Sequence, residues 1–499
     1  MGKQAKNAIS PTRNEDYPMW YQEVVKESQM AENSPVRGCM VIKPWGYALW
    51  ENIVSQMDAM FKDTGVRNAY FPLFIPLSYL EKEAEHVEGF AKECAVVTHH
   101  RLEAGEDGLV PAGKLTEPLV VRPTSETIIG ESMARWTSSY RDLPILLNQW
   151  ANVVRWEMRT RIFLRTSEFL WQEGHTAHAT EQAARERTMM MLDVYTDFVE
   201  NYLAMPVIRG RKTASERFPG AVDTTCIEAM MQDKKALQAG TSHFLGQNFA
   251  RGSEITFQNA DKQEQYAWTT SWGSSTRMIG GMIMTHGDDD GVIMPPRVAP
   301  AHVVLLPIAR KQAEFRKIMD YTQTLADALK SRLYHGRKII VEIDDRDIGG
   351  ARGWEWIKKG IPVRVEIGPR EVADNAVYAA RRDAPVNEKR VVQREEFVNT
   401  IEDLLDSIQD NLFNRAKNFR KANTREIDET PAFYDFYREE GAGGFVMAHW
   451  CGSEKCESKI KEDLSVTIRC IPFESRTEEG KCICCGSPSS RRVLFSKAY

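Results

Sequence analysis

The sequence predicts three consecutive parts: an α+β region with antiparallel strands over residues 1–294, an α/β domain over 295–417 and a small α/β C-terminal domain over 418–499. Three observations support this prediction. A strand hairpin and further β-rich segments fill the first part, strands alternate with helices in the second, and six of the nine cysteines crowd the last fifty residues. The proline-rich segment Pro295–Pro300 separates the first two parts, because it cannot continue a helix or a central strand.

The composition is that of an ordinary soluble protein, with 27% charged and 42% hydrophobic residues. A net charge of −5 gives no overall sign of polyanion binding, so contact with nucleic acid would rely on local patches. No apolar run approaches the ~20 residues that cross a bilayer, and the N-terminus lacks the apolar segment of a signal peptide. It also lacks a myristoylation signal, since Lys6 stands where Ser or Thr is required. We therefore expect a cytoplasmic protein without a membrane span.

The first part should begin with an amphipathic helix at 46–64, because apolar residues recur there every four positions: Leu49, Ile53, Met57 and Phe61. The next β-rich run contains Pro72 and Pro76, so it should be an edge strand or a bent strand. A short helical segment is expected at 81–93.

A polar loop with several glycines is predicted at 103–114. A strand then turns into a helix that Thr124 or Ser125 would cap. A long helix is expected at 181–203, followed by a second β-rich region at 238–291.

In the second part, a buried-type strand at 302–308, an amphipathic helix at 311–334 and another strand at 338–344 follow one another. Strand and helix alternation of this kind predicts a mostly parallel sheet.

The stretch from Asn152 to His178 is the strongest candidate for a functional site, because its residues are hard to explain by a structural role alone. It predicts two strands joined by a basic loop, and the first strand has a charged face with Arg155, Glu157 and Arg159 opposite an apolar face with Val154, Trp156 and Met158. The second strand combines aromatic, acidic and imidazole groups on one face: Phe169, Trp171, Glu173 and His175. Buried charges are costly unless paired, and a phosphate-bearing ligand is one natural partner for arginine. The alternative is a structural ion-pair network.

Three separated segments resemble the signature motifs of class II aminoacyl-tRNA synthetases: a helix and proline-containing strand at 46–72, an Arg-x-Glu hairpin at 155–175, and the helix SWGSSTRMIGGM with Arg277. Their order and the words RPTSET, WQEGH, GTSH and SWG resemble prolyl-tRNA synthetase, of the type shared by eukaryotes, archaea and some bacteria. The resemblance implies a class II catalytic domain, an anticodon-binding domain and a zinc-associated C-terminal domain. The stretch from Arg165 to Trp268 is too short for the editing insertion of the other bacterial type, so none is expected.

The implied reaction is activation of L-proline with ATP to prolyl-adenylate, followed by transfer to the 3′ end of tRNA(Pro). ATP, Mg²⁺ and a homodimer are implied as well. The carboxylate of proline is ionised at neutral pH, so the first step needs alignment and positive charge at the α-phosphate rather than a general base. Arg155 is the candidate for the α-phosphate, and Arg277 for the γ-phosphate or the adenine face. These two are the candidate catalytic residues.

The resemblance assigns ATP binding to Arg155, Glu157, Arg165, Phe169, Gln238, Thr241, Ser275 and Arg277. It assigns proline binding to Thr124, Glu126, Arg155, Trp171, Glu173, His175, His243, Ser271 and Gly273. Phe169 would stack on adenine, while Glu157 would accept a hydrogen bond from the adenine amino group or orient Arg155. Trp171 would offer the proline ammonium an apolar wall and a cation–π face, with Glu126 and Thr124 as acceptors.

Structural alternatives remain for several of these residues. His175 and His243 could be core histidines, and His178 is expected to be structural. Asp288–Asp290 suggest metal ligands by type, although a solvated turn is the expected interpretation.

In the α/β domain, the segment GWEWIKKGIPVRVEIGPREV resembles the anticodon-binding segment of the family. Arg352, Glu355 and Arg370 are the candidates to contact guanine bases, since arginine pairs with guanine acceptors and a carboxylate accepts from its amino group. Ile357 occupies a place that often carries a second acidic residue in the family, which is a departure from the pattern. A surface helix of mixed charge is the alternative.

The C-terminal cysteines offer enough thiolates for a structural Zn²⁺ site, with Cys451, Cys456, Cys482 and Cys485 as the predicted ligands and Cys484 as the alternative fourth one. Free thiols are the other interpretation, and Cys470 is expected to be buried in a strand. The ending LFSKAY resembles a family ending whose terminal tyrosine carboxylate folds back toward the active site.

Two other classes of protein remain as alternative interpretations of the sequence. One is a synthetase-like protein without catalysis, although Arg155, Glu157 and Arg277 are all present. The other is a related class II enzyme, such as one for threonine.

Overall fold

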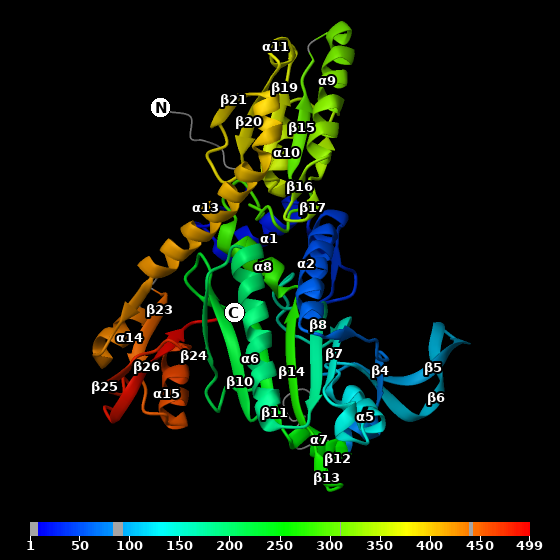
Figure 1. Cartoon of the computed structure of the whole chain (residues 1–499), viewed down its shortest axis with the longest axis vertical. Coiled ribbons are helices and arrows are strands. Elements are labelled where there is room, and N and C mark those ends of the chain that lie inside the picture. Colours follow the sequence, from blue (N-terminus) through cyan, green and yellow to red (C-terminus); the bar gives the residue numbers. More distant parts are fainter. Residues whose placement is uncertain (1–7, 83–92, 310, 439–442) are drawn as a thin grey trace.

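The fold is seen in a computed structural model of the chain, which describes residues 8–82, 93–309, 311–438 and 443–499. Figure 1 shows an elongated molecule, with the α/β domain at the top, the central sheet in the middle and the C-terminal domain at the lower left. A long hairpin extends to the right. The predicted fold class, an α+β part with an antiparallel sheet followed by two α/β parts, is confirmed.

The central sheet is antiparallel over its main strands. Their order is β9 (Val207–Arg211), β10 (Asp223–Met230), β11 (Ala236–Gly246), β14 (Trp268–Ser275), β8 (Glu168–His178) and β7 (Ile145–Val154), and β3 (Arg67–Asn68) joins β7 in parallel. The predicted hairpin of β7 and β8 pairs from Ile145 opposite Ala177 to Val154 opposite Glu168.

One detail of the hairpin prediction is wrong. β7 ends at Val154, so Arg155, Glu157 and Arg159 lie in the connecting loop instead of on a strand face. The chain leaves the ladder just after this point: the backbone N–H of Arg155 still donates to the Ser167 carbonyl oxygen at 2.8 Å, but that of Trp156 donates at 2.8 Å to the Glu93 carbonyl oxygen instead of to the partner strand. Trp156 and Met158, expected on an apolar face, are exposed there.

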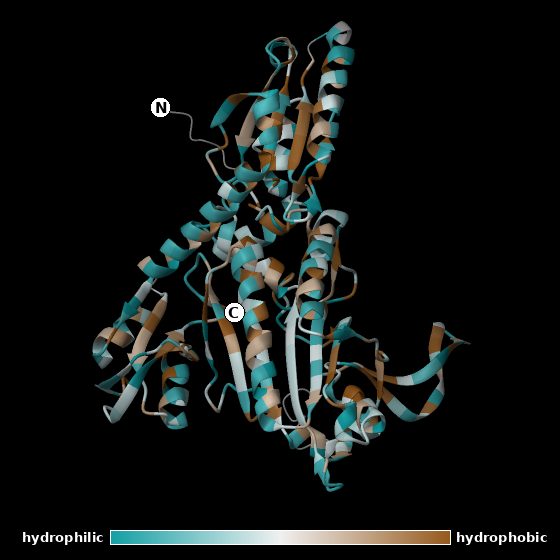
Figure 2. Cartoon of the chain, in the orientation of Figure 1, coloured by the Kyte–Doolittle hydropathy of each residue, from teal (hydrophilic) through white to brown (hydrophobic). Residues whose placement is uncertain are grey.

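Helices cover one face of this sheet. The predicted long helix is present as α6 (Glu181–Asp197), continued by a π-helical turn at Phe198–Tyr202, and it packs across β10, β11 and β14. Phe61 of α2 (Pro44–Asp63) lies 6.0 Å from the ring of Tyr195 and 6.4 Å from that of Trp272. A side chain at Gly174 would place its Cβ 1.9 Å from the Trp272 ring, so this core requires glycine there. Figure 2 shows β8 and β14 in pale and teal colours, whereas the strands at the centre of the α/β domain are brown.

The C-terminal domain continues the same sheet, which the sequence did not predict. β24 (Thr467–Pro472) pairs with β9 through Ile471 opposite Arg211, and β26 (Pro488–Ser496), β23 (Phe445–His449) and β22 (Thr424–Glu426) follow outward. β25 (Thr477–Lys481) pairs with β26, and α14 (Thr430–Arg438) and α15 (Glu454–Leu464) complete the domain.

In the α/β domain, β15 (Val303–Pro307) lies between two parallel neighbours, β18 (Val341–Ile343) and β19 (Val363–Ile367). The next strands, β20 (Ala376–Arg381) and β21 (Lys389–Gln393), are antiparallel, so the sheet is mixed instead of mostly parallel. The accompanying helices are α9 (Gln312–Lys330), α10 (Ala351–Lys359), α11 (Pro369–Ala373), α12 (Arg394–Asn399) and α13 (Ile401–Ala422). α13 runs from this domain to the C-terminal domain (Figure 1).

The polar loop predicted at 103–114 is instead the outer part of a long hairpin, formed by β5 (Val96–Gly105) and β6 (Gly108–Val121). Both faces of its outer half are solvated, so the sequence carries no apolar alternation there. β4 (Phe74–Pro76) pairs with β6, and α3 (Leu77–Lys82) precedes the segment predicted as helical at 81–93, most of which lies outside the described residues.

Ser125 is the residue before α5 (Glu126–Trp136), but its side chain does not cap that helix. The further elements are α1 (Tyr17–Glu27), β1 (Ala31–Asn33), β2 (Met40–Ile42), η1 (Tyr140–Asp142), α7 (Asn248–Gly252), β12 (Thr256–Gln258), β13 (Glu264–Tyr266), α8 (Arg277–His286), β16 (Leu333–Tyr334) and β17 (Arg337–Lys338). Among the helices of the described residues, none combines the length and apolar character needed to cross a bilayer.

Candidate active site

A cavity of about 320 Å³ lies against β8, β11 and β14. It brings together most of the predicted substrate residues: Thr124, Glu126, Arg155, Phe169, Trp171, Glu173, His175, Gln238, Thr241, His243, Ser271, Gly273, Ser275 and Arg277. Glu157 and Arg165 line an adjoining cavity of about 110 Å³, which Arg155, Phe169 and Arg277 also line. Alternation along β8 explains the arrangement, because Phe169, Trp171, Glu173 and His175 share one face.

Three arginines meet where the two cavities join. Arg155 donates from Nε to the Pro123 carbonyl oxygen at 3.0 Å, and its guanidinium lies 5.6 Å from the Phe169 ring centre and 5.3 Å from that of Trp171. Arg277, the first residue of α8, donates from Nε to the Leu164 carbonyl oxygen at 3.0 Å. Burial, together with the positive charges of Arg165 and Arg155, lowers the pKa of Arg277 to about 10. It remains cationic at neutral pH, and such a concentration of positive charge favours an anionic ligand.

Glu157 pairs with Arg165, with 2.9 Å between Oε2 and Nε, and its other oxygen accepts from the backbone N–H of Arg159 at 3.1 Å. The carboxylate therefore orients Arg165 in this structure, a partner that the sequence prediction did not include.

The opposite end of the cavity is held by a buried network around Glu173. Its carboxylate accepts from Ser125 Oγ at 2.5 Å and from Gln149 Nε2 at 2.9 Å, and it lies 3.0 Å from His175 Nε2. Burial disfavours the charged form of His175, but the hydrogen bond to Glu173 and the charges of Glu126 and Glu173 outweigh it and raise the pKa of His175. Glu173 thus acts on the cavity through the orientation and charge of His175.

The rest of this end is lined by a neutral histidine, an aromatic ring, hydroxyl groups and the carboxylate of Glu126. Burial, together with the charge of His175, lowers the pKa of His243 to about 3, and its Nδ1 lies 3.0 Å from Thr224 Oγ1. The Trp171 ring is in van der Waals contact with the position where Gly273 would carry a Cβ. Thr124 hydrogen-bonds Glu126, and within the described part of the chain the buried Trp171 Nε1 and Ser271 Oγ find no hydrogen-bond partner. Buried polar atoms of this kind beside a cavity indicate a ligand or water.

The sequence prediction missed one wall of the cavity. Lys212, Glu216, Arg217, Phe218 and Pro219 line it from the segment between β9 and β10, and Thr224 lies beside them. A polar Ser, Gly and Pro segment between two strands predicts only a loop, so the local sequence gives no signal of its position.

His178 lies outside the cavity residues, where it hydrogen-bonds Thr176 at 2.8 Å. A turn is present at Asp288–Asp290 as expected, but it is half-buried, and two of its carboxylates are paired instead of solvated. Asp288 receives two hydrogen bonds from the buried Arg382, at 2.6 and 2.7 Å, and Asp289 pairs with Arg13. This turn therefore connects the central sheet region to the α/β domain.

The chain end lies beside β11. The Tyr499 hydroxyl donates to Asp233 at 2.5 Å, and its ring lies 5.7 Å from the guanidinium of Arg161 and 5.1 Å from Lys235 Nζ. The terminal residue thus contacts the loop between β7 and β8, while the described residues that line the main cavity do not include it.

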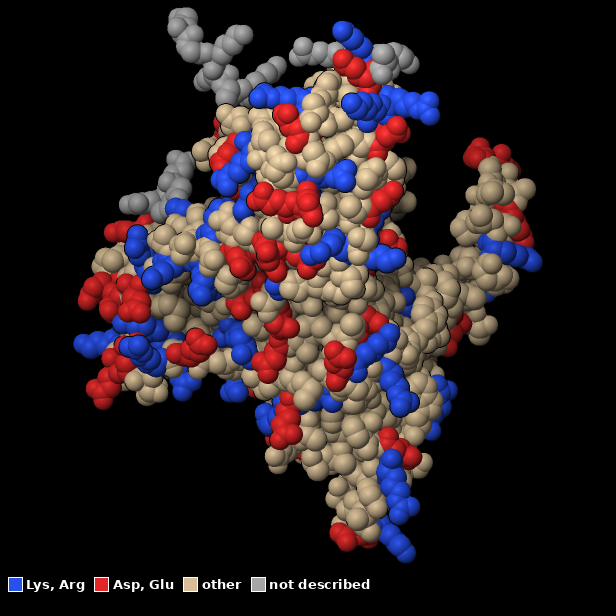
Figure 3. All heavy atoms as spheres, turned by 45° about the horizontal axis from the view of Figure 1, so that its top comes forward, with Lys and Arg blue, Asp and Glu red and all other residues tan. Residues whose placement is uncertain are grey.

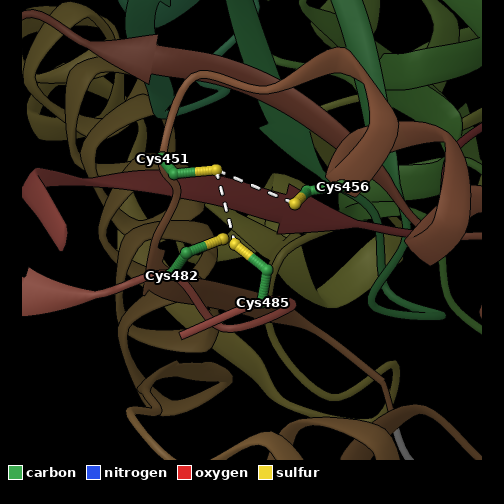
Figure 4. A group of neighbouring side chains, drawn as sticks. All are labelled: Cys451, Cys456, Cys482 and Cys485. Carbon is green, nitrogen blue, oxygen red and sulfur yellow. Dashed lines mark hydrogen bonds between the residues drawn. The ribbon is translucent and has the colours of Figure 1, made fainter. Parts of the chain in front are cut away.

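In the C-terminal domain, Cys451, Cys456, Cys482 and Cys485 point their sulfurs toward one point (Figure 4), with all four within 4.8 Å of one another. Cys451 Sγ lies 3.7 Å from Cys456 Sγ and 3.8 Å from Cys485 Sγ. A tetrahedral Zn²⁺ with thiolates at about 2.3 Å would separate its sulfurs by about 3.8 Å. The donor set and spacing fit zinc, Cys484 is outside this set, and Cys470 is buried as expected.

Of the three residues predicted to contact the anticodon, the structure places only some at one cavity of the α/β domain. Arg352 lines a cavity of about 670 Å³ and donates to the Pro307 and Arg346 carbonyl oxygens at 2.8 and 3.1 Å. Glu355 pairs at 2.7 Å with Arg346, which also lines this cavity. The Arg370 side chain is 88% exposed and is not among the described lining residues. On the face that Figure 3 draws, basic and acidic side chains of the described residues are mixed over this domain, so that face carries no single basic field.

The antiparallel sheet and its arginine-lined cavity define a class II aminoacyl-tRNA synthetase core. The family model of the tRNA synthetase class II core domain (G, H, P, S and T) matches residues 113–286, that of the anticodon binding domain matches 302–404, and that of the prolyl-tRNA synthetase C-terminal region matches 434–499.

Curated relatives identify the family within this class of synthetases. A proline–tRNA ligase of Anaeromyxobacter dehalogenans is 59% identical, with 99% of both chains covered, and one of Bdellovibrio bacteriovorus is 58% identical over 99% of this chain and 100% of its own. The chain therefore belongs to the prolyl-tRNA synthetase family. The crystal structure of the Cryptosporidium parvum prolyl-tRNA synthetase complexed with L-proline and AMP matches with a TM-score of 0.90 and 35% identity, over 100% of this chain and 99% of that one.

Proposed function

We propose that this cavity activates L-proline with ATP to form prolyl-adenylate, and that the enzyme then transfers the prolyl group to the 3′ end of tRNA(Pro). One observation carries the proposal: a cluster of three arginines adjoins a pocket of aromatic, carboxylate and imidazole groups across two neighbouring cavities. This arrangement suits a reaction between a phosphate and a small amphipathic amino acid. The identity to proline–tRNA ligases excludes the threonine and non-catalytic alternatives.

The arginines would act on ATP. Arg155 lines both cavities, so it can hold the α-phosphate beside the proline carboxylate and neutralise the negative charge that grows as the bond forms. Arg277 and Arg165 would bind the outer phosphates, and Glu157 would hold Arg165 in place. Phe169 would stack on adenine. Gln238, Thr241 and Ser275 would contact ATP at the same end, where Mg²⁺ needs few protein ligands because it binds mainly water and phosphate oxygens.

Proline would occupy the end of the cavity around Trp171 and His243. Trp171 and Gly273 would pack its ring, and Glu126 with Thr124 would accept hydrogen bonds from its secondary ammonium. His175, held by Glu173, and the neutral His243 with Ser271 would complete the wall. A pocket that recognises shape discriminates by only about 10- to 200-fold per methylene, so slow activation of alanine is expected.

We also propose that tRNA binds the α/β domain near Arg352, Glu355 and Arg370, and that Zn²⁺ in the cysteine cluster is structural, since it would lie outside the cavity. A homodimer is proposed from membership of the family. The cysteines of the described residues form no disulfide, which supports a cytoplasmic location.

The type shared by eukaryotes, archaea and some bacteria, without an editing insertion, remains part of the proposal. Full-length similarity to the Cryptosporidium enzyme supports it, although the relatives named above are bacterial. The domain limits 1–294, 295–417 and 418–499 are proposed as well.

Proline-dependent exchange of pyrophosphate into ATP tests the function. The purified enzyme should exchange with proline, far more slowly with alanine, and at background with threonine and glycine. Equal exchange with and without proline would refute the proposal.

A further inference from the structure

The cavity wall at residues 212–219, here called the cap segment, is held by the C-terminal domain. Five of its side chains line the cavity, namely Lys212, Glu216, Arg217, Phe218 and Pro219. Its remaining polar side chains, Thr213 and Ser215, face a different part of the molecule. Both bind α15, which is more than two hundred residues further along the chain.

Glu457 of α15 makes these contacts. Its two carboxylate oxygens accept from Thr213 Oγ1 and Ser215 Oγ, each at 2.7 Å. Glu457 is 4% exposed and Thr213 is 2% exposed, so water cannot readily replace either partner. Hydrogen bonds to a buried carboxylate are stronger than neutral ones. One turn further along α15, Lys461 Nζ lies 3.1 Å from Glu216 Oε1.

The beginning of the cap segment is anchored too. Lys212 Nζ donates to Glu228 at 2.8 Å and to the Arg469 carbonyl oxygen of β24 at 2.7 Å. The segment is therefore tied to the C-terminal domain both at β24 and at α15.

The other end of the segment reaches the proline side of the cavity. The Phe218 ring lies 4.6 Å from the His243 ring, and its backbone N–H donates at 3.2 Å to Thr224 Oγ1, which in turn lies 3.0 Å from His243 Nδ1. The arginines assigned to ATP come from the loop between β7 and β8 and from α8. A shift of the cap segment should therefore disturb proline binding more than ATP binding.

We propose that Glu457 is a positioning residue for proline. Through Thr213 and Ser215 it sets the cap segment so that Phe218 closes the pocket against His243. The inference rests on the proposed function, and it gives the C-terminal domain a part in amino-acid binding that does not involve direct contact with the substrate.

Steady-state pyrophosphate exchange with Glu457→Ala tests this. We expect the KM for proline to rise about tenfold, as loss of roughly 1.4 kcal/mol would produce, while the KM for ATP changes less than about twofold. Glu457→Gln should recover much of the loss, because an amide can accept from one hydroxyl and donate to the other. Glu462→Ala, on the exposed side of the same helix, is the matched control and should behave as wild type.

Limited trypsin digestion provides a readout that needs no activity. The bond after Arg217 should be cut faster in Glu457→Ala than in wild type or Glu462→Ala, as mass spectrometry of the fragments would show. Ser215→Ala removes one of the two contacts from the exposed side of the segment and should give a smaller effect in the same direction, which keeps the test valid if the first variant folds poorly.

Unchanged cleavage after Arg217, or equal rises in both KM values, would overturn the inference. Wild-type protein without proline-dependent exchange would refute the proposed function instead, and the digestion result would still decide whether Glu457 holds the cap segment.

Discussion

Replacing Glu228 by glutamine should destabilise the sheet where the catalytic and C-terminal domains join. Glu228 is fully buried on β10, where it accepts from Lys212 at 2.8 Å and from Arg469 at 3.0 and 3.1 Å. Burial alone would raise its pKa, but the charges and hydrogen bonds of Arg469 and Lys212 lower it below the ordinary value. Glutamine keeps the shape and leaves two buried cations without their counter-charge.

Removing one partner of a buried ion pair costs about 3–5 kcal/mol. For a unit of about 150–250 residues, each kcal/mol shifts Tm by about 2–4 °C, so a fall of roughly 6–20 °C is expected in thermal unfolding followed by circular dichroism at neutral pH.

Glu181→Gln is the matched control, since Glu181 forms an exposed pair with Arg185 and its loss should cost less than about 1 kcal/mol. The double variant Glu228→Gln with Arg469→Met should recover part of the loss, because only one buried cation then remains unpaired. Equal melting of Glu228→Gln and Glu181→Gln would refute the reasoning.

Three further predictions follow from the site. The pKa of His175 is raised in the folded state, so its stabilisation is complete below the unfolded value of about 6.5 and disappears as pH rises through the folded value; the Tm difference between wild type and His175→Gln should shrink from pH 6 to pH 9, and a constant difference would contradict this. Arg277→Lys keeps the charge but loses the planar donor fork, so kcat for pyrophosphate exchange should fall about a hundredfold; an unchanged kcat would exclude the assigned role. Cys456→Ser should lower zinc content measured by mass spectrometry, whereas Cys484→Ser should leave it unchanged; equal zinc loss in both variants would argue against the chosen ligand set.

Site residues were predicted best from the sequence where they are close together in the chain. Alternation along β8 placed Phe169, Trp171, Glu173 and His175 on one face, and the structure brings them to one cavity. The cysteine cluster is a similar case, because the spacing of Cys482 and Cys485 already favoured them over Cys484.

Prediction failed where position depends on distant partners. The cap segment has the composition of an ordinary loop, and its place follows from Glu457, which is 244 positions from Thr213. Glu157 could not be assigned to Arg165 in advance, because both lie in a loop whose path depends on where β7 ends. The hairpin of β5 and β6 was not predicted, because a strand that is solvated on both faces shows no alternation of apolar and polar residues.

The pairing of β24 with β9 also has a consequence for how the protein is made. Ile471 pairs with Arg211, so the ladder on that edge of the catalytic sheet joins residues 260 positions apart. During synthesis, β9 leaves the ribosome long before β24 exists, so its outer backbone groups have no partner strand until β24 emerges. A shortened chain that ends before β24 would expose this edge permanently and offer it to other chains. Synthesis of β24 thus decides when this edge of the catalytic sheet is covered.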